Sequence, residues 1–337
     1  MSFARPLLVS LALALASATA LPALAENPVD IQRRLEDVAG AVKVGERMVE
    51  LAPLKEFYRQ RGYRLAWNGQ GESAADRLLT DLQALAHGEG LAPESYTVSA
   101  TGNDLDHDLL VSDALARFTR DLATGRVAPT RQVGGMGPET RPAFDATKVL
   151  RDLASGTDLA SAIEPLPPAF AGYQRLKQTL ERYRVLVRNG GWAVIPDGPS
   201  IKPGMEDDRL PAVRRRLIVT GELDAKHDKG KVLDQHLASA LRKFQVRHGI
   251  EADGAVGKST LAALNVSADE RLKQIVANLE RWRWMPRTLD STHIAVNLPA
   301  AHMELVRNGE IQMAMRVVVG DPKHPTPTMQ TAMTSVV

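Results

Sequence analysis

Apolar side chains recur every three or four positions through most of the first 190 residues, which is the spacing of helices buried on one face. The pattern predicts four helical stretches, at residues 31–66, 73–88, 111–123 and 173–187. The first of them is expected to break at Gly40 and Pro53. Glycine and proline are frequent between residues 130 and 147, so a loop is expected there. The first 190 residues are therefore predicted to be mostly helical, with their charges on solvated faces.

The pattern changes after residue 190. Residues 192–196 predict a short strand, and a small helical unit follows, in which Asp234 is a suitable N-cap and Gly249 a suitable stop. Three helices are expected in this unit, at residues 212–217, 234–249 and 259–264. A fourth covers residues 269–284, with Leu272, Ile275, Val276 and Leu279 facing inward.

After Pro286 the apolar positions alternate, with a period of two. Residues 293–298, 303–306 and 312–319 predict the opening strands of an antiparallel β domain, with a turn at residues 307–310. The predicted fold class is mainly α with a C-terminal β portion, a multi-domain α+β protein.

The N-terminus has the layout of a secretory signal peptide. One positive charge precedes an apolar run at residues 7–16, and two small-x-small sites follow, Ala18-Thr19-Ala20 and Ala23-Leu24-Ala25. The run is too short to span a bilayer. Cleavage near Glu26 and export as a soluble chain are expected; the alternative is an uncleaved N-terminal anchor.

Composition narrows the possible chemistry. The chain has 337 residues, which is more than a domain with a single hydrophobic core usually contains, so several domains are expected. Its formal net charge of +2 is too small to indicate a nucleic-acid partner. It contains no cysteine, which excludes disulfides, thiolate metal ligands and cysteine nucleophiles within these residues.

Three apparent motifs carry no function. The string 254–259 resembles a phosphate loop, but position 252 is alanine and no strand precedes it. The eight histidines lack paired ligand spacing, so neither a metal nor a cofactor is expected. The run Arg214-Arg215-Arg216 is interpreted as a solvated helix face.

One block of residues carries a family resemblance. Phe244-Gln245, Arg247-His248-Gly249, Asp253-Gly254, Gly257, Thr260 and Leu264-Asn265-Val266 resemble the three-helix peptidoglycan-binding module of cell-wall enzymes. With residues 278–286 after it, the order is similar to the large periplasmic murein L,D-transpeptidases. Residues 54–67, 90–96 and 124–129 resemble the helical scaffold domain of that family, and residues 318–320 and 325–327 its early catalytic strands.

The resemblance implies a division of the chain: signal peptide 1–25, helical scaffold domain 26–203, peptidoglycan-binding-like domain 204–268, and a linker helix with the incomplete antiparallel β catalytic domain at 269–337. It also implies a shallow groove for peptidoglycan glycan strands or stem peptides. The residues expected to bind or shape it are Phe244, Gln245, Asp253, Gly254, Gly257 and Thr260. Other cell-wall synthases are further expected partners, and the periplasm is the expected location.

In this family a cysteine thiolate attacks the amide before the terminal D-alanine of a stem tetrapeptide, and the amine of a neighbouring stem resolves the thioester. The sequence ends before the motif that carries the family's histidine and cysteine, so no catalytic residue is transferred, and His293, His302 and His324 receive no role. Three hypotheses remain: a truncated L,D-transpeptidase that is inactive as given, a non-catalytic peptidoglycan-binding or scaffold protein, and an exported helical protein with no wall role.

Overall fold

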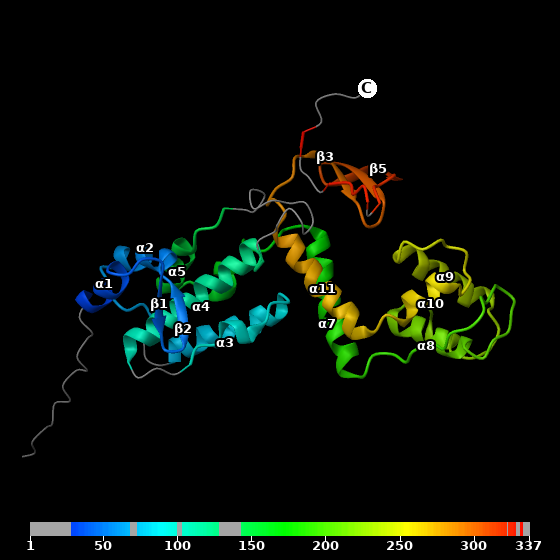
Figure 1. The fold of residues 1–337 in the computed structure, drawn as a ribbon, viewed down its shortest axis with the longest axis horizontal. Coiled ribbons are helices and arrows are strands. Elements are labelled where there is room, and N and C mark those ends of the chain that lie inside the picture. Colours follow the sequence, from blue (N-terminus) through cyan, green and yellow to red (C-terminus); the bar gives the residue numbers. More distant parts are fainter. Residues whose placement is uncertain are drawn as a thin grey trace, which may run out of the picture.

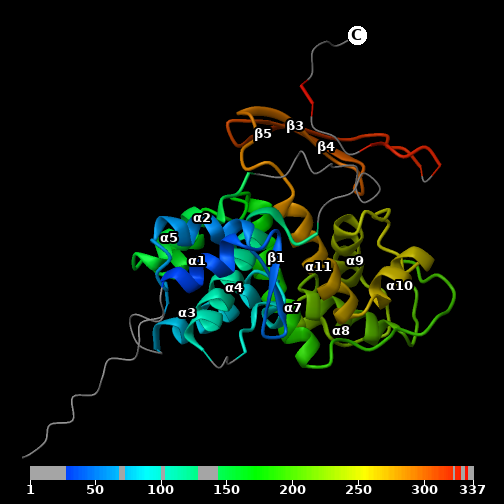
Figure 2. The ribbon, with the colours of Figure 1, turned by 60° about the vertical axis from the view of Figure 1, so that its left-hand side comes forward.

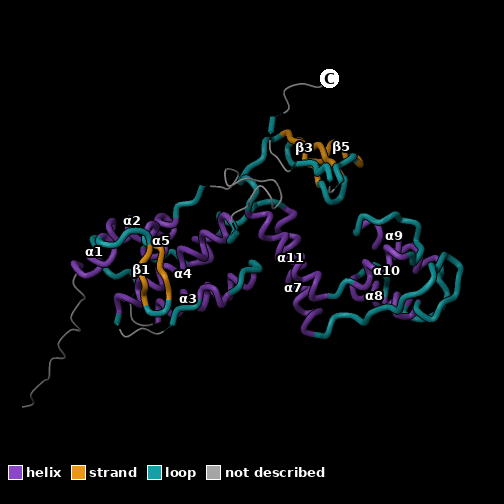
Figure 3. Tube along the Cα trace, in the orientation of Figure 1, coloured by secondary structure: helices purple, strands orange, loops and turns teal. Residues whose placement is uncertain are grey.

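The computed structural model describes residues 28–67, 73–99, 103–127, 143–321, 323–327 and 331–332. The predicted signal peptide at residues 1–25 lies outside the described residues. The predicted fold class is confirmed, because helices dominate and a three-stranded antiparallel sheet lies at the C-terminal end (Figures 1 and 3). No helix in the described ranges is both long enough and apolar enough for a transmembrane span.

The N-terminal body is built around the helix α4, which is buried along most of its length. Its elements are α1 (Pro28–Glu36), β1 (Ala41–Val44), β2 (Arg47–Glu50), α2 (Ala52–Gln60), α3 (Ser73–Gly88), the 3-10 turn η1 (Pro93–Tyr96), α4 (Asp104–Thr124), α5 (Ala146–Ala154) and α6 (Leu159–Ile163). A single apolar core joins these elements.

The helix expected across residues 31–66 is wrong in its middle. Residues 41–50 form a β-hairpin, in which Ala41 pairs with Glu50 and Val44 with Arg47. Gly45 in the turn has φ +58°, and alternation places Val44 and Val49 in the core. Ten residues with period two therefore interrupt the helical pattern.

The expectation that charges in this part lie on solvated faces is also wrong for three carboxylates of α4. Asp108, Asp113 and Asp121 are 0, 2 and 6% exposed. Asp108 accepts hydrogen bonds from the amides of Ala66 (2.9 Å) and Trp67 (2.7 Å). These bonds replace the water lost on burial, so the carboxylate holds the chain where it turns back towards the core.

Two long helices, α7 (Ala171–Arg188) and α11 (Ala268–Arg283), form an antiparallel pair at the centre of the molecule (Figures 1 and 2). Their shared core contains Tyr173, Leu180, Tyr183, Ile275 and Leu279, and it confirms the inward positions predicted for α11. The chain leaves this pair after α7 and returns to it at α11. The residues between them fold separately.

Those residues form the second helical body, around Phe244 and Leu241. It contains α8 (Leu210–Thr220), α9 (Gln235–Arg247) and α10 (Lys258–Asn265), as predicted, and also the 3-10 turn η3 (Ala225–His227), which was not predicted. Asp234 caps α9 by accepting the amide of Leu237 at 2.9 Å, and Gly249 after it has φ +66°. The strand predicted at residues 192–196 is absent from this described segment: its backbone bonds instead to the side chain of Asn265.

Beyond α11 the chain enters the sheet β3 (Thr292–Asn297), β4 (His302–Arg307) and β5 (Glu310–Arg316). The strands pair antiparallel in the order β3-β4-β5, with an irregularity between Leu305 and Val306. Asn308 (φ 51°) and Gly309 (φ 82°) make the predicted turn between β4 and β5. The three expected strands are confirmed, and they lie beyond the C-terminal end of α11 in both ribbon views.

Candidate functional site

The predicted binding residues come together where α9 meets the turn before α10. Gln245 is 1% exposed and connects the two elements. Its Nε2 donates to Asp253 Oδ1 at 2.7 Å and to Thr260 Oγ1 at 3.0 Å, while its Oε1 accepts the Gly254 amide at 2.8 Å. One amide side chain therefore fixes the path of residues 253–260.

The same turn depends on glycine. Gly254 has φ +76°, and a Cβ there would lie 3.1 Å from the carbonyl oxygen of Ala238. Gly257 is the N-cap residue of α10. Hydrogen bonds from the Ala255 amide and the Gln245 side chain lower the pKa of Asp253, whose side chain is exposed at the turn. Asp253 is therefore an anionic group held in one orientation at the surface.

Phe244 anchors the core beneath this turn and is fully buried. The ring of His248 stacks on it, with 4.0 Å between ring centroids, and Nδ1 of His248 lies 2.9 Å from the carbonyl oxygen of Phe244. Because a carbonyl only accepts, Nδ1 carries the proton of this hydrogen bond. Partial burial lowers the pKa of His248 to about 4.

The interpretation of Arg214-Arg215-Arg216 as a solvated face is wrong for two of the three. Arg214 is 1% and Arg216 2% exposed. Arg214 donates to the carbonyl oxygens of His227 (2.9 Å) and Val232 (2.8 Å) and pairs with the cap Asp234 at 2.5 Å. A guanidinium has five donors, so it can enter a body whose loop carbonyls need partners.

Arg216 connects this body to the central helix pair. Its guanidinium lies 3.5 Å from the ring centroid of Trp192 and donates to the carbonyl oxygen of Leu264 at 3.0 Å. Burial lowers the pKa of Arg216 to about 10. Trp192 in turn packs edge-on against Tyr183 of α7 and donates to the carbonyl oxygen of Val266. Aromatic and cation-π contacts thus hold the second helical body, which we call the module, against α7 and α11.

The other end of α11 is attached to the N-terminal body by what we call the Arg283 cluster: Glu89, Tyr173 and Arg283. The guanidinium of Arg283 is 1% exposed and donates to the backbone oxygen of Glu89 and to Tyr173 Oη (3.1 Å). Tyr173 donates to Glu89 Oε2 at 2.6 Å. The cluster joins the end of α3, the start of α7 and the end of α11.

A second set of contacts supports the same junction. Glu280 of α11 accepts the amide of Val127, after α4, at 2.9 Å, and Arg287 donates to the carbonyl oxygen of Ala123. Trp282 covers Gly172: a Cβ on Gly172 would lie 2.6 Å from the indole ring. These contacts were not predicted from the sequence; the available signal was the aromatic-rich end of the helix at residues 282–284.

The histidines of the sheet region have local partners. His293 Nδ1 lies 2.7 Å from the carbonyl oxygen of Asp290, His302 lies 3.9 Å from Glu304, and His324 lies 3.4 Å from Asp321. None of these arrangements includes a nucleophile.

Gly172→Ala is expected to loosen the junction of α7 and α11. The new methyl group overlaps the indole of Trp282, and the cost exceeds the helix-propensity gain, leaving a net loss of about 1–2 kcal/mol in the free energy of unfolding. Urea denaturation measures it. Gly88→Ala is the matched control, because a Cβ there meets nothing within 4 Å. Equal stabilisation by both substitutions would contradict the contact.

His248 should make the module less stable in acid. The unfolded histidine takes up a proton near its ordinary pKa of 6.5, whereas the folded one does so near 4, so the unfolded state binds more protons between these values. Stability is therefore lost as pH falls from about 6.5 to about 4, by about 1–3 kcal/mol. Melting curves of the chain and of His248→Gln across this window test it, and identical pH slopes would refute it.

Comparison with protein-family models finds three matches. Residues 52–180 match a scaffold domain, residues 212–264 a putative peptidoglycan binding domain, and residues 291–337 an L,D-transpeptidase catalytic domain. A comparison with curated proteins finds no match. The matches confirm the family resemblance, and they suggest peptidoglycan as a partner and an extracytoplasmic location. Together, in this order along one chain, these domains indicate a cell-wall protein of the L,D-transpeptidase family.

Proposed function

We propose that this chain holds peptidoglycan in the periplasm, after export and removal of a signal peptide at residues 1–25. The observation that supports this most is the attachment of both ends of the α7–α11 pair. Trp192 and Arg216 connect the peptidoglycan-binding module to one end, and the Arg283 cluster connects the N-terminal body to the other, from which the chain continues into the strands that match the catalytic domain. A glycan or stem peptide on the module would thus be held at one end of the α7–α11 pair, while the chain continues into those strands from the other end.

The proposed division keeps the scaffold domain at 26–203, the binding domain at 204–268, and the linker helix with catalytic strands at 269–337. Within the binding domain we propose a shallow groove for peptidoglycan. Its shape is set by Phe244, Gln245, Gly254, Gly257 and Thr260, which do not meet the ligand with exposed side chains. Asp253 is the exposed member of the set. Other cell-wall synthases are proposed as additional partners.

The chain itself is proposed to be non-catalytic. Acyl transfer in this family requires a thiolate, and these residues contain no cysteine. The alternative, that the chain serves only as a peptidoglycan-binding scaffold, uses the same module and the same rigid attachment. Both proposals assign peptidoglycan binding to these residues.

Sacculus binding tests the proposal. The chain without residues 1–25 is expected to sediment with isolated sacculi. Gln245→Ala should reduce the sedimented fraction severalfold, because it leaves Thr260, Asp253 and the Gly254 amide without their shared partner, at about 1–3 kcal/mol. Gln235→Ala on the same helix is the matched control, since Gln235 is exposed. A chain that stays in the supernatant at every concentration would refute wall binding.

Incubation with tetrapeptide-bearing muropeptides is expected to give no cross-linked dimers and no thioester adduct. The physical reason is the missing thiolate. Mass spectrometry of the muropeptides and of the intact chain measures both products, and an active family member with its cysteine serves as the positive control. Detection of either product would overturn the non-catalytic assignment.

A further inference from the structure

A groove of about 620 Å³ lies on the N-terminal body, on the side of α4 that faces β2, α2 and α5. Its walls carry both signs of charge: Arg117 and Arg120 from α4, Glu50 from β2 and Asp145 before α5. Pro53 and Phe144 add apolar surface. This size and this mixture of an apolar lining with a few charged groups are typical of small-molecule and peptide sites.

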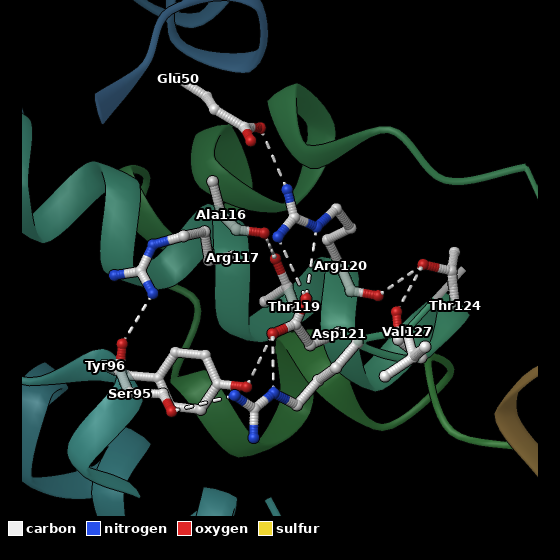
Figure 4. A network of polar contacts seen from close by, with 12 residues as sticks. Glu50, Ser95, Tyr96, Ala116, Arg117, Thr119, Arg120, Asp121, Thr124 and Val127 are labelled. Atoms are coloured by element: carbon white, nitrogen blue, oxygen red, sulfur yellow. Dashed lines mark hydrogen bonds and ion pairs between the residues drawn. The ribbon is translucent and has the colours of Figure 1, made fainter. Parts of the chain in front are cut away.

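The two arginines are held in place by hydrogen-bonding partners; Figure 4 shows Arg120 between Glu50 and Asp121, and Arg117 bonded to the carbonyl oxygen of Ser95. Arg117 donates to Asp113 Oδ2 at 2.7 Å and to the carbonyl oxygen of Ser95 at 2.7 Å. Arg120 spans from Asp121 (3.2 Å) to Glu50 (3.1 Å) and keeps 41% of its side chain exposed. Both guanidinium groups are therefore oriented before any ligand arrives, which reduces the entropy cost of binding.

Two further features favour a carboxylate. Nη2 of Arg117 is buried and has no hydrogen-bond partner among the described residues, a state that costs about 1–3 kcal/mol. The first residues of α2 and α5 also line the groove, so the positive ends of two nine-residue helices point to it. A carboxylate in the groove would be attracted by the Arg117 guanidinium and by these helix ends, and Nη2 of Arg117 would donate to it only after a movement that exposes this atom.

The acidic groups favour an amine on the same ligand. Glu50 is 63% exposed and Asp145 is exposed, so both can accept from an ammonium group at modest desolvation cost. Asp145 also accepts the amide of Thr147 at 2.9 Å, which fixes its carboxylate at the groove edge. Arg120 and Glu50 pair with each other at 3.1 Å, so a ligand with one carboxylate and one ammonium group would insert between them and replace this exposed ion pair with two ion pairs of its own.

We propose that this groove binds a short peptide that carries both a free carboxylate and a free amine, the chemistry of a peptidoglycan stem. The choice of the stem as its source rests on the proposed function. The groove is separate from the α8–α10 module, so one chain would contact the wall at two places. In this arrangement the scaffold domain takes part in peptide recognition as well as in support.

The test titrates the free stem tetrapeptide, released from sacculi, into the isotope-labelled chain. Amide shifts are expected at Ala52, Ala146 and Thr147. Arg120→Gln and Glu50→Gln should each raise Kd about fivefold to tenfold, because each removes one charged hydrogen bond. Arg33→Gln, an exposed charge on α1 that does not line the groove, should leave Kd unchanged. Matched melting curves separate lost binding from lost folding.

Chemically modified peptides test which charged group of the ligand each side chain binds. N-acetylation of the peptide should weaken binding to the wild-type chain and remove the effect of Glu50→Gln, while amidation of its carboxylates should remove the effect of Arg120→Gln. Shifts confined to α8–α10, or unchanged Kd in both groove variants, would overturn the groove proposal and leave sacculus binding intact. Peptide binding at the groove without sacculus sedimentation would instead refute the proposed wall function alone.

Discussion

The buried guanidinium of Arg283 is the contact on which the arrangement of the domains depends. It reaches the backbone of Glu89 and the hydroxyl of Tyr173, so the N-terminal body, α7 and α11 meet at one charged group that is 1% exposed. Leaving a buried hydrogen-bonding group without its partner typically costs about 1–3 kcal/mol, and more for a charged group, because that group stays desolvated. These contacts connect α7 and α11 to the N-terminal body at one place.

From that junction follows the placement of the wall-binding module. The helices α7 and α11 run antiparallel, so the module inserted between them in sequence lies at the end opposite the Arg283 cluster. Trp192 and Arg216 hold it there by stacking and by bonds to the carbonyls at the end of α10. The same pair of helices therefore separates the module from the strands that match the catalytic domain, which follow the other end of α11.

Helices and strands were predicted correctly where apolar residues recur regularly over a long stretch of sequence. The helices at 111–123, 173–187, 234–249 and 269–284 and the three C-terminal strands are present because a buried face repeats with the period of its element. The hairpin at 41–50 was missed because its alternation is only ten residues long and lies within a helical context. The carboxylate of Asp108 and the guanidinium groups of Arg214 and Arg216 were misplaced because buried charges depend on partners that spacing cannot reveal.

By itself the sequence determined the fold class, the order of the domains and the absence of any thiolate, since periodicity, motif order and composition are all properties of the linear chain. Only the tertiary structure decided which charges are buried, how the module is attached, and that Glu50, Arg117, Arg120 and Asp145 line one groove. The physical reason is that partners up to 194 residues apart, such as Glu89 and Arg283, satisfy each other's polar groups only after the helices have packed.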